Sequence, residues 1–195
     1  MGQVNWPVFF IVLVAVILVI LGLIWIINAR RLDRLHRTVI QSRLTLNEAL
    51  THRAAAASDF SSSGALDVAG AILLADASQQ SISQAHVPLS DDGLEDGPGH
   101  RRPTRQADED RLTTESNLSR TLRLVLDGLE EGELTEEQKR LLDELTEARE
   151  NVRLARRFHN AFVDQARRLR SNAFVRVTRS AGGAPMPMPV DMDDV

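Results

Sequence analysis

The sequence predicts an all-α protein in which an N-terminal single transmembrane helix is followed by an antiparallel up-and-down helical bundle. Three observations predict this architecture. Residues 8–27 carry no charge, and 19 of these 20 residues are apolar. Apolar residues in later segments recur at spacings of three and four, and no segment alternates with a period of two over a useful length, so we expect no sheet. With 195 residues, the chain has room for one modest domain and additional segments.

Residues 8–27 form the predicted transmembrane helix. At about 1.5 Å per residue, this segment makes a helix of roughly 30 Å, which is the thickness of the hydrocarbon layer of a bilayer. Trp6 and Trp25 lie near its ends, where indole rings favour the headgroup level. A cleaved signal peptide is disfavoured because residues 1–7 contain no Lys or Arg and the apolar stretch is too long.

The flanking charges predict the orientation of this helix. Four arginines follow the apolar segment within ten residues, whereas only the α-amino group is positive before it. The positive-inside rule therefore makes residues 1–7 a short extracytoplasmic N-terminus and places the rest of the chain in the cytoplasm. We expect a single-pass protein of the plasma membrane.

The cytoplasmic bundle is predicted to span residues 28–180. Its expected helices cover about residues 28–57, 65–86, 108–127 and 135–173. In the first of them, Ser42 interrupts an otherwise apolar stripe. Residues 58–64 are expected to break the chain, and residues 87–107, with three prolines and three glycines, are expected to form a disordered loop. Residues 181–195 are expected to form a disordered tail.

The last helix has the strongest periodicity. Thr135 and Gln138 form a capping-box pattern at its start. A narrow seam then follows, with regular steps of four and three residues, through Leu141, Leu145, Ala148, Val152, Ala155, His159, Phe162, Ala166, Leu169 and Ala173. Such a seam also suits an extended parallel coiled-coil oligomer. The bundle is favoured because the preceding helices carry short, separate apolar stripes.

Charge is distributed unevenly along the chain. Residues 127–150 carry ten acids and three bases, whereas residues 151–180 carry eight bases and one acid. In an up-and-down bundle the basic end of the last helix returns toward the membrane, where it would form a collar facing anionic headgroups. Solvated surface is the alternative. The candidate lipid-headgroup contacts are Arg30, Arg31, Arg34, Arg37, Arg167, Arg168 and Arg170.

Residues 150–160 of the last helix carry the pattern Glu-Asn … Ala-Arg-Arg-Phe-His-Asn. This pattern resembles the LemA family of bacterial membrane proteins. The family motif, Glu-Asn … Ala-Arg-Arg-(Phe)-Tyr-Asn, matches here at Ala155 and at Glu150, Asn151, Arg156, Arg157, Phe158 and Asn160, with His159 in place of the tyrosine. Residues 32–53 and 181–185 are similar to a shorter LemA-like group with an Arg-Arg-Phe-His-Asn motif. The resemblance implies an N-terminal membrane helix, a cytoplasmic antiparallel bundle and no established enzymatic activity. It implies a membrane-associated accessory or scaffold role, in some members alongside membrane proteases.

No catalytic, cofactor-binding or metal-binding residue is predicted. The chain has no cysteine, which excludes disulfides and thiolate-ligated metals, and it has no Gly-x-x-x-x-Gly-Lys nucleotide loop. His159 occupies a seam position, where it is either a pH-sensitive or ligand-binding group or, as is commoner, a packed and hydrogen-bonded side chain. Nucleic-acid binding is disfavoured because the formal charge is −4 and the phenylalanines of the basic region lie on or next to the seam.

These features predict a membrane-anchored helical-bundle scaffold or accessory protein without catalysis. Its expected partners are the lipid bilayer and other membrane proteins. The alternative is a self-assembling coiled-coil protein of the cell envelope, in which the last helix pairs with that of a second copy in a homo-oligomer.

Overall fold

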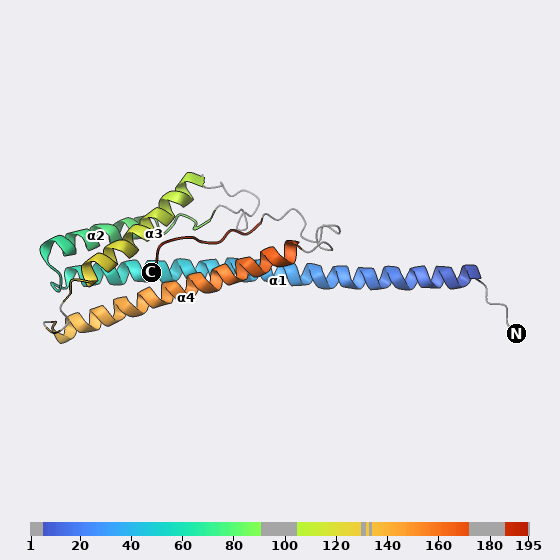
Figure 1. The fold of residues 1–195 in the computed structure, drawn as a ribbon, viewed down its shortest axis with the longest axis horizontal. Helices are drawn as coiled ribbons and strands as arrows, with labels where there is room; N and C mark the ends of the chain where they lie inside the picture. The colour runs from blue at the N-terminus through green and yellow to red at the C-terminus, as the bar shows by residue number, and fades with distance from the viewer. Residues whose placement is uncertain (1–5, 91–104, 130–131, 133, 172–185, 195) are drawn as a thin grey trace.

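A computed structural model describes residues 6–90, 105–129, 132, 134–171 and 186–194. Over these residues the chain forms four helices and no strand, which confirms the predicted all-α class. The helices are α1 (Trp6–Ser62), α2 (Val68–Ser83), α3 (Arg105–Leu126) and α4 (Glu136–Ser171). They run alternately up and down, with α4 along the bundle part of α1, and α2 and α3 over its C-terminal half (Figure 1).

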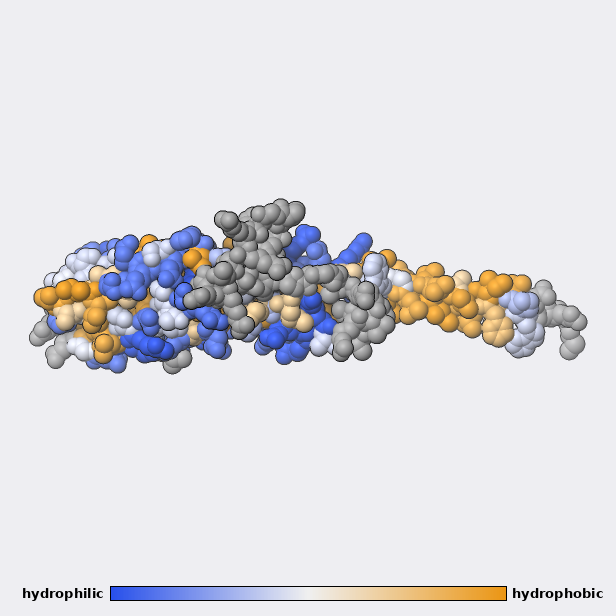
Figure 2. Space-filling view, turned by 90° about the horizontal axis from the view of Figure 1, so that it is seen from above, coloured by the Kyte–Doolittle hydropathy of each residue, from blue (hydrophilic) through white to orange (hydrophobic). Residues whose placement is uncertain are grey.

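The predicted membrane helix and the first helix of the bundle are one uninterrupted helix. Residues 6–27 of α1 extend beyond the other elements, and every one of them is exposed (Figures 1 and 2). Burial begins at Leu32 and then recurs along the rest of α1. Among the described residues, α1 is the one helix long and apolar enough to cross a membrane.

The break predicted at residues 58–64 was placed too early, because α1 continues to Ser62. Its last turn is stabilised by serine side chains: the hydroxyls of Ser61 and Ser62 donate to the carbonyl of Ser58 at 2.7 and 2.8 Å. Phe60 is fully buried in the same turn. The chain turns at Gly64, whose φ of 75° lies in the left-handed region that glycine adopts without strain.

The seam of α4 packs against α1, as the sequence predicts. The fully buried positions of α4 are Leu145, Ala148, Val152, His159, Val163 and Ala166. Near the C-terminal end the buried residue is Val163, whereas Phe162 is half-buried beside it. The capping box is present, since the Thr135 N–H donates to Gln138 Oε1 at 2.9 Å and the Gln138 N–H donates to Thr135 Oγ1 at 3.3 Å. Residues 172–173 lie outside the described residues.

Three apolar clusters follow one another along the bundle. The largest lies at the end away from the apolar segment, where Phe60, Leu74 and Leu122 bring α1, α2 and α3 together. The smallest lies nearest residues 6–27, where Leu35 and Val39 of α1 pack on Val163 and Ala166 of α4. The α4 helix therefore ends beside the point at which α1 leaves the bundle.

The middle cluster contains residues that the sequence predicts to be disordered. Val190 and Met192 of the expected tail, and Leu89 of the expected loop, are buried with Leu46 and Val152. Residues 186–194 form an extended segment, called the C-terminal strap below, which runs between α3 and α4 (Figure 1). Val190 and Met192 are two positions apart, which is the spacing of an extended segment, so the helical periodicity that predicted the rest of the core did not include them. Residues 91–104, 181–185 and 195 lie outside the described residues.

Candidate functional site

The residues of the LemA-like motif point in different directions around α4. Glu150, Asn151, Arg157 and Phe158 are exposed, and Glu150 is bound to Arg153 at 2.6 Å on the solvent side. His159 is completely buried in the seam. The half-buried polar members are Arg156 and Asn160, and these two both face the C-terminal strap. The motif residues therefore lie on at least two different surfaces of the bundle, and they do not converge on one catalytic centre.

His159 connects α4 to the residue that interrupts the apolar stripe of α1. Its Nδ1 atom lies 2.9 Å from Ser42 Oγ, and the Ser42 hydroxyl donates to the Val39 carbonyl at 2.8 Å. A serine hydroxyl has one proton. We therefore assign the proton of the His159–Ser42 hydrogen bond to Nδ1. This geometry gives His159 a packed, hydrogen-bonded role.

Asn160 holds the backbone of the strap. Its Nδ2 donates to the carbonyl of Val190 at 2.9 Å, and its Oδ1 accepts from the N–H of the same residue at 2.9 Å. One carboxamide thus satisfies both backbone groups of an extended residue whose side chain is fully buried. On the same face of α4, Arg156 binds both carboxylate oxygens of Asp194 at 2.6 Å.

The opposite side of the strap is bound by α3. Arg123 forms two hydrogen bonds with the Asp193 carboxylate, at 3.0 and 2.8 Å, and Arg120 adds a third at 3.3 Å. The Asp193 N–H donates to Ser116 Oγ at 3.1 Å. Sequence reasoning missed all three α3 residues, because their shared role depends on a segment far away in the chain. The adjacent acidic residues Asp193 and Asp194 were the feature of the sequence that could have indicated arginine partners.

A buried polar network lies deeper in the bundle. Arg53 of α1 donates to the carboxylate of Glu115 at 2.9 Å and to Ser119 at 2.8 Å, both on α3. Ser81 of α2 donates to the same Glu115 oxygen at 3.0 Å. Burial lowers the pKa of Arg53 from its usual value, and the charge of Glu115 acts in the opposite direction. This cluster locks three helices together and is enclosed by them.

A second surface, the α1–α4 groove, opens near the apolar segment. It has a volume of about 560 Å³, and Phe158 and Phe162 of α4 and Arg34 and Arg37 of α1 are among its lining residues. Phe158 is 61% exposed, which is unusual for a phenylalanine on a helix that carries a packed seam. Arg37 also pairs with Asp33 at 3.0 Å on the solvent side.

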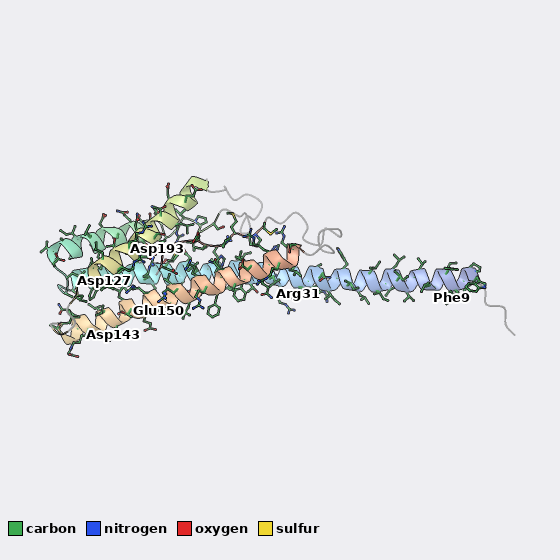
Figure 3. The ribbon with its side chains drawn as sticks, viewed as in Figure 1. Phe9, Arg31, Asp127, Asp143, Glu150 and Asp193 are labelled. Carbon is green, nitrogen blue, oxygen red and sulfur yellow. The ribbon has the colours of Figure 1, made fainter. Side chains whose placement is uncertain are left out.

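The contact between α1 and α4 brings the arginines of the predicted collar to one end of the bundle. Arg31 lies level with the C-terminal end of α4 (Figure 3). The arginines of α1 at positions 30, 31, 34 and 37 are exposed, as are Arg167 and Arg168, whereas Arg170 is half-buried. Burial lowers the pKa of Arg170. Both groups of arginines therefore occupy the end of the bundle from which residues 6–27 project.

Among the residues that the structure describes, no group of three or more His, Asp or Glu side chains is placed to hold a metal ion. No protein-family model, curated protein or solved structure significantly matches the chain.

Proposed function

We propose that this chain is a single-pass membrane protein whose helical bundle serves as a cytoplasmic scaffold or accessory module without catalysis. The observation that carries the proposal is the continuity of α1. Its exposed apolar residues 6–27 pass without a break into a stretch that is buried in the bundle from Leu32 onward. A rigid helical connection would hold the bundle at a fixed distance from the bilayer.

The arginines at the same end of the bundle support this placement. Arg30 and Arg31 follow the apolar segment directly, and the contact between Val39 and Val163 brings the basic end of α4 to the same level. Each Lys or Arg near an anionic bilayer contributes about 1 kcal/mol of attraction. The collar would therefore strengthen anchoring and favour an N-terminus outside the cell.

The LemA-like motif supports the scaffold part of the proposal. The resemblance implies a membrane-associated accessory role, and the exposed motif residue Phe158 lines the α1–α4 groove beside Arg34. A groove that combines exposed aromatic rings with arginines is suited to the binding of another protein close to the membrane. Other membrane proteins are therefore the proposed partners, in addition to the bilayer.

Membrane extraction and topology reporters test the anchoring proposal. The full chain should stay with membranes after alkaline carbonate extraction, whereas the double substitution Val16→Arg and Val19→Arg should release it. A phosphatase that is active only outside the cytoplasm, fused after Val195, should be silent, and a fluorescent protein at the same place should be bright. Release of the unaltered chain by carbonate would contradict membrane anchoring, and an active phosphatase would contradict the orientation.

Co-purification tests the scaffold proposal, and light scattering tests self-assembly. Phe158→Ser should weaken the capture of membrane proteins by the chain, whereas Leu154→Ser, also on an exposed part of α4, should not. The alternative, a self-assembling coiled-coil protein, would use the seam of α4, which here packs against α1 of the same chain. A detergent-solubilised monomer would therefore favour the scaffold, and a stable oligomer would favour the alternative.

A further inference from the structure

We propose that the channel between α1, α3 and α4 is a peptide-binding groove, and that the C-terminal strap is its built-in occupant. The segment it would accept from a partner protein is extended, with two apolar residues spaced by two positions and followed by acidic side chains. In this chain that segment reads Val190, Asp191, Met192, Asp193 and Asp194. The inference does not depend on membrane anchoring.

The first support is the way in which Asn160 holds the strap. Its carboxamide makes both hydrogen bonds of the Val190 backbone and none with a strap side chain. Such a clamp accepts any extended segment, because every residue except proline offers the same N–H and C=O pair. A third hydrogen bond to the strap backbone, from Asp193 N–H to Ser116 Oγ on α3, holds the other side.

The second support is the arrangement of side chains along the strap. Val190 and Met192 point into the middle apolar cluster, whereas Asp191 between them is exposed. This alternation is the pattern with which extended peptides are recognised: backbone bonds provide affinity and pockets for alternate side chains provide specificity. The pocket walls come from Leu46 and Leu50 of α1 and from Val152 of α4.

The third support is the matching charge at the acidic end. Asp193 is bound by Arg120 and Arg123 of α3, and Asp194 is bound by Arg156 of α4 through both carboxylate oxygens. Arginine on two helices thus selects consecutive acidic residues at the end of the segment. A peptide with basic residues at these positions would meet like charges and be rejected.

The strap can be replaced because it is joined to the helices by side chains rather than by shared secondary structure. It belongs to no helix, and α3 and α4 contact each other little along their lengths. It is connected to α4 in the same chain through residues 172–185, which lie outside the described residues, so its binding is intramolecular. A partner segment must therefore compete with the strap, and this competition would lower the apparent affinity of the groove for the partner segment.

Binding of a labelled peptide, residues 186–195 of this sequence, to the detergent-solubilised full chain tests the proposal. Val190→Asp in the chain should empty the groove and raise peptide affinity at least about tenfold, as expected when the strap occupies about nine in ten of the unaltered molecules. If circular dichroism shows that this variant is unfolded, the double substitution Asp193→Arg and Asp194→Arg would be used to release the strap. A released, folded chain that does not bind the peptide would overturn the proposal.

Two further measurements test where the peptide binds. In the released chain, Asn160→Ala should weaken peptide binding at least about tenfold, whereas Asn151→Ala, on the exposed face of α4, should leave it unchanged. Arg156→Asp should weaken binding of the peptide with the unaltered sequence of residues 186–195. The same substitution should restore binding of a peptide that carries Asp194→Arg. Equal effects of the two asparagine substitutions would overturn the proposed site. A dimer of the unaltered chain that Val190→Asp abolishes would also overturn the proposal, in favour of strap exchange between copies.

Discussion

Ser42 of α1 and His159 of α4 meet in the middle of the helix seam, with 2.9 Å between Oγ and Nδ1. Each is a polar residue in an apolar stripe of its own helix. The fully buried imidazole therefore has a hydrogen-bond partner across the interface. The pair also aligns the two helices, because a slide of one turn would take the His159 N–H away from Ser42 and leave it without this acceptor, whereas Ser42 would keep its bond to the Val39 carbonyl.

This pair yields a prediction about stability. Ser42→Ala removes the acceptor of the buried His159 N–H, and we expect the free energy of unfolding to fall by about 1–3 kcal/mol. Thr38→Ala, one turn away, removes only a hydroxyl bonded to its own helix and should cost less. Chemical denaturation of both variants, with a double-mutant cycle that includes His159→Leu, measures the coupling. Additive effects of the Ser42 and His159 substitutions would show that the pair does not interact.

The buried ion pair between Arg53 and Glu115 should be one of the most sensitive points of the fold. Glu115→Gln leaves the Arg53 guanidinium, only 2% exposed, without its bonded carboxylate. We expect a loss of about 3–5 kcal/mol in the free energy of unfolding. Glu150→Gln breaks the exposed pair with Arg153 and should change this quantity by less than about 0.5 kcal/mol. Similar effects of the two substitutions in denaturant melts would contradict this assignment.

Two phenylalanines offer a matched comparison of burial. Phe60 is fully enclosed in the largest apolar cluster, whereas Phe158 is 61% exposed. Phe60→Ala should cost about 3–5 kcal/mol, and Phe158→Ala less than about 0.5 kcal/mol. Phe162→Ala should fall between them, because this ring is half-buried at the α1–α4 groove. If thermal melts show a larger loss of stability for Phe158→Ala than for Phe60→Ala, the wrong face of α4 has been assigned as buried.

Removing the capping box at the start of α4 should have a smaller effect on the free energy of unfolding. Thr135→Ala removes the side-chain oxygen that accepts from the Gln138 N–H, and we expect a loss of about 1 kcal/mol in the free energy of unfolding. Thr113→Ala, which removes an exposed threonine hydroxyl within α3, is the control. The denaturant concentration at the midpoint of unfolding is measured for both variants. No difference between the two variants would mean that Thr135 does not cap α4.

Two of the largest features could be predicted because they are local patterns. An uncharged stretch from residue 8 to residue 27 defines an apolar helix by its length, and the steps of four and three along α4 define its buried side. The ends of the helices were less accurate. Residues 58–62 contain three serines near a glycine, which suggested a break, yet Phe60 and the backbone-bonded serine hydroxyls continue the helix.

The candidate site was predicted only in part. The LemA-like motif drew attention to Arg156 and Asn160, but not to the strap that these residues bind. Their ligands, Asp194 and Val190, lie 38 and 30 residues away in the chain, and no local period connects them. Three other motif residues, Glu150, Asn151 and Arg157, are exposed and outside the strap contacts described above.

The sequence by itself determined the all-helical class, the apolar segment and the side of α4 that is buried, because these follow from the spacing of apolar residues along one helix. Only the tertiary structure decided which polar residues meet: Ser42 with His159, Arg53 with Glu115, and Asn160 with Val190. The first two of these pairs join residues 117 and 62 positions apart. Such contacts depend on how helices are placed against one another, and hydrophobic periodicity specifies the buried face of a helix but not its polar partner.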